Sequence, residues 1–165
     1  MSLFRVLETP LSVADATAAV SGPHVGGIDL FLGAVRDHND GRAVTRLEYH
    51  AYVSMAEKEM QRIAEEIARE IPGVTLAALH RVGSLAVGDL AVVCAAGAVH
   101  RGEAFQACRA LIDRIKHRVP IWKREHGPDG PYWVGWEDAR CPPDHGEHEH
   151  HGHEHHGHKR HGHEH

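Results

Sequence analysis

Apolar residues recur along the chain at two spacings, and the wider spacing predicts helices. Behind Ser54, which forms a capping-box pattern with Glu57, apolar side chains return every three or four residues as far as Ile71. The same spacing covers residues 103–118. We therefore expect two long amphipathic helices, and a shorter one over residues 12–21 that a Gly-Pro pair ends.

Closer apolar spacing, as alternation or as short continuous runs, predicts six strands. They are expected at residues 27–35, 44–52, 74–82, 89–99, 120–125 and 132–136. Polar, turn-rich segments at 36–42 and 83–88 should be loops, with strand 44–52 antiparallel to strand 27–35. Because strands and helices do not alternate regularly, we expect an α+β fold with an antiparallel sheet and two long helices.

The composition predicts one folded unit and a C-terminal tail of a different kind. A chain of 165 residues suits a single domain, which we place at residues 1–136. Eleven of the 18 histidines lie in the segment His145–His165, interleaved with glycine and glutamate, so residues 137–165 should form a disordered tail. That tail either binds nickel or zinc or has no role of its own. In the folded domain we expect no metal site and no required cofactor.

The charge balance and the apolar content exclude several classes of function. Up to residue 136 there are 15 basic and 16 acidic residues, without the cationic excess that a nucleic-acid surface needs. No stretch approaches the roughly 20 apolar residues of a membrane span, and residues 1–10 contain no apolar signal core. Three cysteines without close spacing favour a reducing compartment, so we expect a cytoplasmic protein.

A candidate anion site lies where the most apolar strand meets the second long helix. His100 and Arg101 should stand at the helix N-terminus, where free backbone N–H groups and the helix dipole attract anions. The guanidinium of Arg101 suits phosphate. Position alone leaves a second interpretation open, namely a satisfied loop histidine beside a surface arginine.

Two lysines flank the end of the same helix. Lys116 falls at the edge of an apolar stripe that includes Phe105, where partial desolvation would favour a nucleophilic amine. The alternative is a lysine that extends to solvent and pairs with Asp113. Lys123 follows in an extended segment, and if both amines face one pocket, each weakens the other's affinity for protons.

Arg36 opens the loop that directly follows the buried strand 27–35. Strand ends are where rigid scaffolds present functional side chains, although an ordinary solvated arginine fits the position as well.

Several segments, in order, resemble the large subunit of molybdopterin synthase, the MoaE family. They are FLGAVRDHNDGR, EYHAYVSMAEKEM, HRVGSLAVGDLAV, AVHRGEAFQACRALIDRIKHRVPIWKRE and a closing YWVGW. The resemblance covers roughly residues 27–136, and its most specific element is the pair Lys116 and Lys123 around a Pro-aromatic segment.

The resemblance implies a hammerhead-type fold and a homodimer that binds two small ubiquitin-like sulfur carriers, which together form a heterotetramer. The C-terminal Gly-Gly of each carrier, as a thiocarboxylate, would sulfurate cyclic pyranopterin monophosphate to form the dithiolene of molybdopterin. Lys116 and Lys123 would be the catalytic residues. By the same resemblance the substrate pocket would be lined by Ala34, Val35, Arg36, His100, Arg101, Lys116, Lys123, Arg124 and Glu125.

A histidine-rich metal-storage or delivery protein on a dimeric scaffold is the rival hypothesis. It explains the tail but not the group of basic side chains within the domain 1–136. Substitution of Lys116 separates the two, because it should abolish sulfur transfer and leave metal binding intact.

Overall fold

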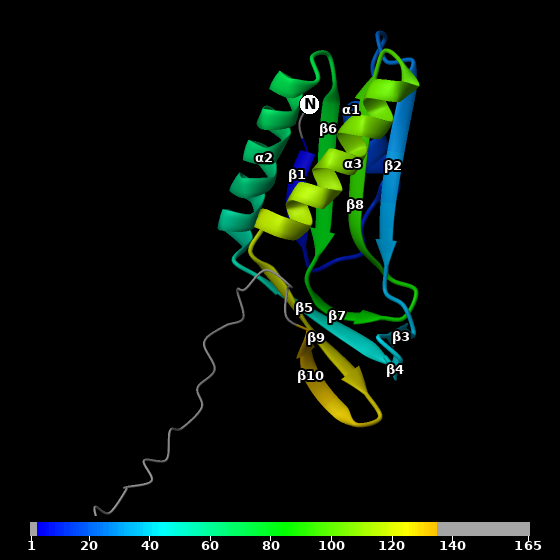
Figure 1. Ribbon diagram of the computed structural model, residues 1–165, viewed down its shortest axis with the longest axis vertical. Helices are drawn as coiled ribbons and strands as arrows, with labels where there is room; N and C mark the ends of the chain where they lie inside the picture. Colours follow the sequence, from blue (N-terminus) through cyan, green and yellow to red (C-terminus); the bar gives the residue numbers. More distant parts are fainter. Residues whose placement is uncertain (1–2, 135–165) are drawn as a thin grey trace, which may run out of the picture.

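The computed structural model describes residues 3–134, which form an α+β domain of two main sheets and three helices (Figure 1). In chain order the elements are β1 (Leu3–Leu7), α1 (Val13–Val20), β2 (Gly27–Ala34), β3 (His38–Asn39), β4 (Arg42–Ala43), β5 (Arg46–Ala51), α2 (Val53–Glu70), β6 (Thr75–Arg81), β7 (Gly83–Ala86), β8 (Leu90–Ala98), α3 (Arg101–Arg118), β9 (Ile121–Gly127) and β10 (Gly130–Val134).

The first sheet has helices on both faces. Its strands lie in the order β1-β6-β8-β2, and every neighbouring pair is antiparallel except β1 and β6. Helix α2 packs over β1 and β6 and α3 over β8 and β2, while α1 covers the opposite face (Figure 1). The core below α2 and α3 is built from their apolar stripes, with Ile63, Ile67 and Leu111 fully buried.

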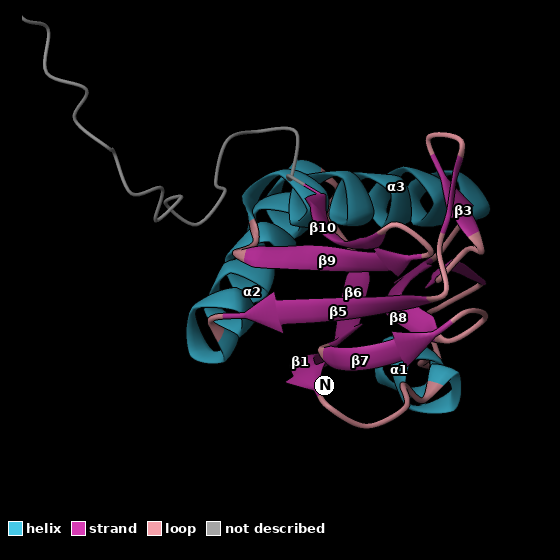
Figure 2. Ribbon diagram, turned by 90° about the horizontal axis from the view of Figure 1, so that it is seen from below, coloured by secondary structure: helices cyan, strands magenta, loops and turns pink. Residues whose placement is uncertain are grey.

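The second sheet lies at one end of the first, and its strands run across the direction of β6 and β8 (Figure 2). It has the order β10-β9-β5-β7, and all its pairs are antiparallel. Two residues connect α3 to β9 and a short loop connects β2 to β3. The C-terminal ends of α3 and β2 therefore meet the second sheet.

The predicted pairing of strand 44–52 with strand 27–35 is wrong. β2 pairs with β8 instead, and β5 pairs with β9 and β7. The nearly continuous apolar run of β2 fits against the buried β8, whereas the β3–β4 hairpin carries the chain out of the first sheet before β5 begins. Local alternation could not reveal this change of sheet.

Four short strands were also not expected. Residues Gly83–Ala86 form β7 where a turn is predicted, and β1 was not predicted at all. The loop 36–42 contains the β3–β4 hairpin, whose two turn residues, Asp40 and Gly41, both have positive φ. An Asp-Gly pair of this kind is a hairpin signal that could have been recognised.

Helix starts were predicted with mixed success. Ser12 caps α1 as its position suggests, since its Oγ accepts a hydrogen bond from the Asp15 backbone N–H at 3.1 Å. The capping box at Ser54 is wrong, because α2 is preceded by Tyr52 and the Glu57 carboxylate accepts from the backbone N–H of Val6 instead. The bonds of Glu57 tie α2 to the edge strand β1.

The predicted histidine-rich tail and the last part of strand 132–136 lie outside the described residues, as does the domain boundary at residue 136. Within residues 3–134, no helix is long and apolar enough to cross a membrane.

Candidate functional site

Lys116 and Lys123 lie at the same end of the domain, where α3 leads into β9 (Figure 1). Lys116 is in the last turn of α3 and is exposed, and no hydrogen bond or salt bridge joins it to another residue of the range 3–134. Lys123 is more enclosed, with 29% of its side chain exposed. The alternative interpretation, a pairing of Lys116 with Asp113, is not seen, since the carboxylate of Asp113 lies 3.6 Å from Arg109.

Lys123 faces a buried carboxylate rather than a second amine. Its Nζ donates to Oε1 of Glu125 at 3.0 Å, and Glu125 is only 1% exposed. Alternation along β9 places both side chains on one face of the second sheet, because the two residues are two positions apart. The structure therefore gives Lys123 an acidic partner that the sequence argument, based on two neighbouring amines, did not include.

Two further donors complete the bonding of Glu125. Asn39 on β3 donates through Nδ2 to Oε1 at 3.0 Å, and the Tyr132 hydroxyl on β10 donates to Oε2 at 2.6 Å. Burial by itself would raise the pKa of Glu125, but the hydrogen bonds from Tyr132, Lys123 and Asn39 together with the charge on Lys123 outweigh it and lower the pKa. Glu125 is thus held as a carboxylate.

Arg36 joins this group through Asn39. Its guanidinium donates to Oδ1 of Asn39 at 3.3 Å, so one amide side chain bridges Arg36 and Glu125.

Ala34 and Arg36 are exposed at the end of β2, whereas the side chain of Val35 is 4% exposed and belongs to the core. The backbone N–H of Val35 donates to the Asp89 carbonyl, and the Val35 carbonyl accepts from Gly88, both at 2.9 Å. Val35 therefore supports the end of β2 rather than lining a surface site.

Arg124 lies on the opposite face of the second sheet, as alternation along β9 requires. It donates to Oε2 of Glu48 through Nε at 3.0 Å and Nη2 at 2.6 Å, and its guanidinium lies 5.4 Å from the ring centre of Trp133. The hydrogen bond from Arg124 is the main reason why the pKa of Glu48 is lowered. Arg124 therefore does not line the same surface as Lys123 and Glu125.

His100 and Arg101 stand at the N-terminal end of α3, as predicted, with His100 as the N-cap residue. Both are exposed. Lys116 lies fifteen positions after Arg101 on α3, a distance of about 22 Å at 1.5 Å per residue. Within one chain the candidate anion site and the lysines are therefore separate, although Arg101 lies beside Gly27 at the start of β2.

Sequence reasoning did not single out Asn39 and Tyr132. The Asp-Gly turn could have indicated the hairpin that carries Asn39. Asn39 on β3 lies 86 residues before Glu125, and Tyr132 on β10 lies seven residues after it. Nothing local in the sequence indicates that these two strands converge on Glu125. Phe105 was expected in the apolar stripe of α3, but it is 57% exposed.

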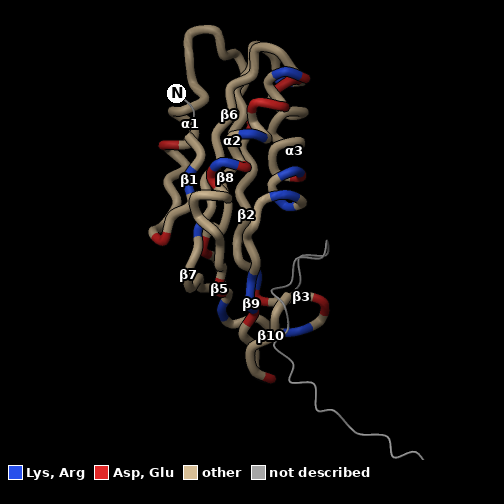
Figure 3. The backbone as a smooth tube through the Cα atoms, turned by 90° about the vertical axis from the view of Figure 1, so that its left-hand side faces the viewer, with Lys and Arg blue, Asp and Glu red and all other residues tan. Residues whose placement is uncertain are grey.

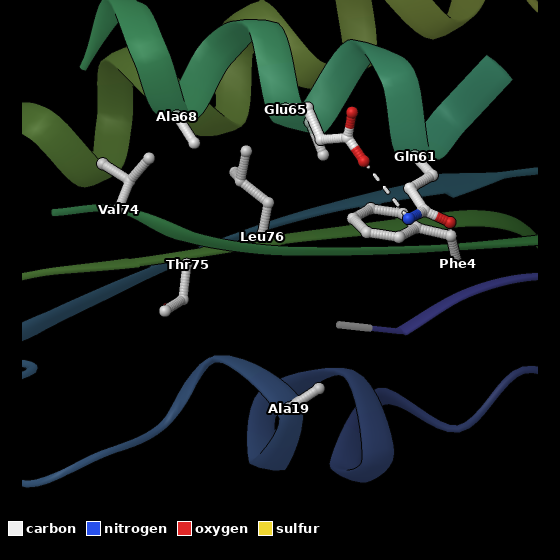
Figure 4. A pocket seen from close by; sticks show the side chains of 9 residues that line it. Phe4, Ala19, Gln61, Glu65, Ala68, Val74, Thr75 and Leu76 are labelled. Atoms are coloured by element: carbon white, nitrogen blue, oxygen red, sulfur yellow. Dashed lines mark hydrogen bonds between the residues drawn. The ribbon is translucent and has the colours of Figure 1, made fainter. Parts of the chain in front are cut away.

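Two cavities of the described domain lie elsewhere. One of about 190 Å³ opens beside α2, between β6 and Phe4 of β1, and Gln61 and Glu65 form a hydrogen bond at its edge (Figure 4). A second, of about 550 Å³, lies along β1 and α1. Neither is lined by a predicted site residue. Among residues 3–134 no group of three histidine, cysteine, aspartate or glutamate side chains is arranged to hold a metal ion.

Comparison with known proteins identifies the family. Residues 6–118 match the model of the family described as MoaE protein. The chain belongs to the MoaE family. Figure 3 shows the charged residues of this MoaE chain along the backbone, with lysine or arginine near the C-terminal end of α3 and on β9.

Among its relatives, this MoaE chain is 49% identical over 131 residues to molybdopterin synthase catalytic subunit 1 of Mycobacterium tuberculosis, covering 79% of this chain and 89% of that protein. It is 42% identical to the molybdopterin synthase catalytic subunit of Halalkalibacterium halodurans, covering 80% of this chain and 85% of the relative.

Solved structures share the fold. The molybdopterin synthase structure from Staphylococcus aureus superimposes with a TM-score of 0.79 at 36% identity, covering 82% of this chain and 98% of that one. A chain from a complex of subunits 1 and 2 of molybdopterin-converting factor from Helicobacter pylori has the same fold, with a TM-score of 0.57, 21% identity and coverage of 67% and 73%. The α+β fold expected from the resemblance is confirmed.

Proposed function

We propose that this chain is the catalytic subunit of a molybdopterin synthase, a sulfurtransferase that moves sulfur from a thiocarboxylated carrier subunit to cyclic pyranopterin monophosphate. The observation that carries the proposal is a hydrogen-bonded set from β9, β3 and the end of β2, within a chain similar to catalytic subunits of that enzyme. The set consists of Lys123, Glu125, Asn39 and Arg36. It offers an oriented amine and a guanidinium to a small anionic substrate.

Within residues 3–134 no cysteine is placed to supply the sulfur, so in this account it comes from outside the chain. Cys94 and Cys108 are buried thiols, and burial raises the pKa of both, that of Cys108 to about 12. Neither can act as an exposed thiolate. A carrier with a C-terminal Gly-Gly thiocarboxylate supplies the sulfur. Its sulfur bonds to a pterin carbon, and water then attacks the acyl carbon as the acyl C–S bond breaks, which leaves the carrier with a carboxylate.

The protein forms a homodimer through the free edge of β2. This strand is the edge of the first sheet, and Ile28, Leu30 and Leu32 on one of its faces are 37–45% exposed (Figure 1). Three apolar side chains on a long unpaired edge favour pairing with another chain. A two-fold axis across β2 would pair the two strands antiparallel.

Such a dimer also brings the candidate anion site at His100 and Arg101 close to the lysines. Arg101 lies beside the start of β2 and Arg36 follows its end, and the strand is about 23 Å long at 3.3 Å per residue. Antiparallel pairing therefore places Arg101 and His100 of a second copy near Arg36 and Lys116 of the first. Each substrate site then combines the lysines of one subunit with the anion-binding helix N-terminus of the other.

Reconstitution tests the function. The purified chain is mixed with a thiocarboxylated carrier and cyclic pyranopterin monophosphate, and the pterin products are separated and identified by mass. Formation of molybdopterin that depends on all three components is expected. An intact precursor after long incubation would contradict the proposal.

The rival function, metal storage or delivery, has no support of its own. It rests on residues 145–165, which lie outside the described residues, whereas the comparisons match catalytic subunits.

A further inference from the structure

We propose that Asn39 and Tyr132 are positioning residues for Lys123, which they fix through the buried carboxylate of Glu125. The inference deepens the proposed function and rests on it. It starts from a carboxylate that is 1% exposed and accepts hydrogen bonds from three different strands, β3, β9 and β10.

The hydrogen bonds define where the Glu125 carboxylate points. Asn39 and Lys123 share Oε1, each at 3.0 Å, and Tyr132 holds Oε2 at 2.6 Å. With both oxygens occupied, the carboxylate cannot rotate without the loss of at least one bond. Because one Lys123 proton is directed at a fixed Oε1, the remaining two donors of its ammonium have a restricted direction.

Asn39 extends this control to Arg36. Its amide nitrogen donates to Glu125 and its amide oxygen accepts from Arg36, so only one orientation of the amide satisfies both neighbours. Arg36 and Lys123 are thereby held in a fixed relation, although they come from the end of β2 and from β9. A small anionic substrate would contact both cations from a single direction.

The hairpins that carry the two positioning residues are themselves packed together. Thr45 donates through its backbone N–H to the carbonyl of His126 at 2.8 Å, and a Cβ on Gly127 would come within 2.4 Å of the Ala43 carbonyl oxygen. Arg42 lies 4.9 Å from the ring centre of Tyr132. The β3–β4 and β9–β10 hairpins thus close around Glu125 from two sides.

Two substitutions remove these contacts. Tyr132→Phe removes one hydroxyl with little change in volume, and Asn39→Ala removes the amide that joins Glu125 to Arg36. Their matched controls are Tyr52→Phe, an exposed tyrosine, and Gln61→Ala, an exposed amide on α2 that donates to Glu65 at 3.2 Å.

The decisive readout is a double-mutant cycle with Lys123→Ala in single-turnover sulfur transfer by the full chain. Each positioning variant should slow the wild-type rate constant at least about fivefold, the factor that corresponds to one hydrogen bond of about 1 kcal/mol, at unchanged apparent KM. In the Lys123→Ala background Tyr132→Phe should have no further effect, because its target is gone. Asn39→Ala should keep only the smaller effect that it exerts through Arg36. The two controls should leave the rate unchanged.

A pH profile gives a second readout. The titratable groups that face Glu125 are Lys123 on β9, Tyr132 on β10 and Tyr49 on β5. Farther out, Arg36 lies behind Asn39, and Asp40 and Arg42 lie near Tyr132. Loss of a donor removes a contribution that lowers the pKa of Glu125, so the acid limb of the rate profile should move to higher pH in both variants.

The outcomes are distinguishable. If the wild-type chain transfers no sulfur, the proposed function fails and the positioning proposal fails with it. If the wild type is active but the effects of Asn39→Ala and Tyr132→Phe persist in full without Lys123, or the acid limb does not move, the positioning proposal alone is overturned.

Discussion

The two lysines of the site differ in what surrounds their amines. Lys123 is held by a buried carboxylate with further donors, whereas Lys116 is exposed at the last turn of α3 and makes no hydrogen bond or salt bridge within the described residues. A residue that is held in one direction suits orientation of a substrate, whereas an exposed lysine without a carboxylate partner leaves its amine available to a substrate that desolvates it on binding. We therefore assign the covalent or proton-transfer step of the proposed reaction to Lys116.

The first prediction concerns that assignment. Arginine at position 116 keeps a positive charge but cannot lose its proton in the working range. Lys116→Arg should therefore be nearly as damaging as Lys116→Ala, with each slowing single-turnover sulfur transfer by about 10²–10⁴. Substantial activity in Lys116→Arg would reduce the role to charge balance, and near-normal activity in Lys116→Ala would remove it altogether.

His80 carries a prediction about acid stability. Burial lowers its folded-state pKa to about 4, against about 6.5 in an unfolded chain. Between these values the unfolded chain binds a proton that the folded one does not, so stability falls as pH drops from about 6.5 to about 4, by at most about 3 kcal/mol. Urea unfolding at pH 7 and pH 5 should show a smaller loss of unfolding free energy for His80→Phe than for wild type.

His24→Phe, which replaces an exposed histidine, is the control and should lose as much unfolding free energy as wild type. An equal loss of unfolding free energy in His80→Phe and wild type would refute the argument.

At the scale of elements, helices were predicted better than sheet pairing. The apolar stripes of α2 and α3 are local signals, and both helices end within a residue of the predicted place. The pairing of β5 depends on contacts with β9, some 75 residues later, which no local pattern contains. Prediction of the site residues was limited for the same reason. Lys123 and Glu125 are two residues apart on one strand, whereas Asn39 contacts Glu125 from the distant strand β3.

The edge strand β2 provides a prediction at this scale. Leu32 is 45% exposed on the free edge of the first sheet, so Leu32→Glu should convert the proposed dimer to a monomer without loss of fold. Met55, 59% exposed on α2, gives the matched control, and Met55→Glu should remain dimeric. Light scattering and circular dichroism measure both properties. A monomeric wild type would show that the protein does not form the proposed dimer. A dimeric Leu32→Glu would show that the interface lies elsewhere than at β2.

At the scale of the whole molecule, the account requires two copies for each complete site. Lys116→Ala and Arg101→Ala should then complement each other when the subunits are unfolded together and refolded as mixed dimers. Half of the dimers are mixed and each has one intact site, so about a quarter of wild-type activity should return at low substrate concentration. Failure of complementation, with mixed dimers shown by mass, would mean that Arg101 acts within its own chain or not at all.

The histidine-rich segment carries the last structural prediction. We propose that residues 145–165 bind nickel or zinc through their 11 histidines, independently of sulfur transfer. A chain that ends at residue 136 should keep its unfolding midpoint and its activity and lose most of its affinity for either metal in calorimetric titration. Unfolding of the shortened chain would show that the domain boundary is misplaced, and unchanged metal affinity would move the site to another part of the chain.

Tracing the sulfur tests the central claim most directly. A carrier whose C-terminal thiocarboxylate holds a heavy sulfur isotope is mixed with this protein and cyclic pyranopterin monophosphate, and the masses of both the pterin and the carrier are measured. The account predicts that both dithiolene sulfurs of the pterin are heavy and that the carrier ends as a carboxylate. A pterin without the heavy isotope, or a carrier that keeps its sulfur in the presence of the wild-type chain, would contradict it.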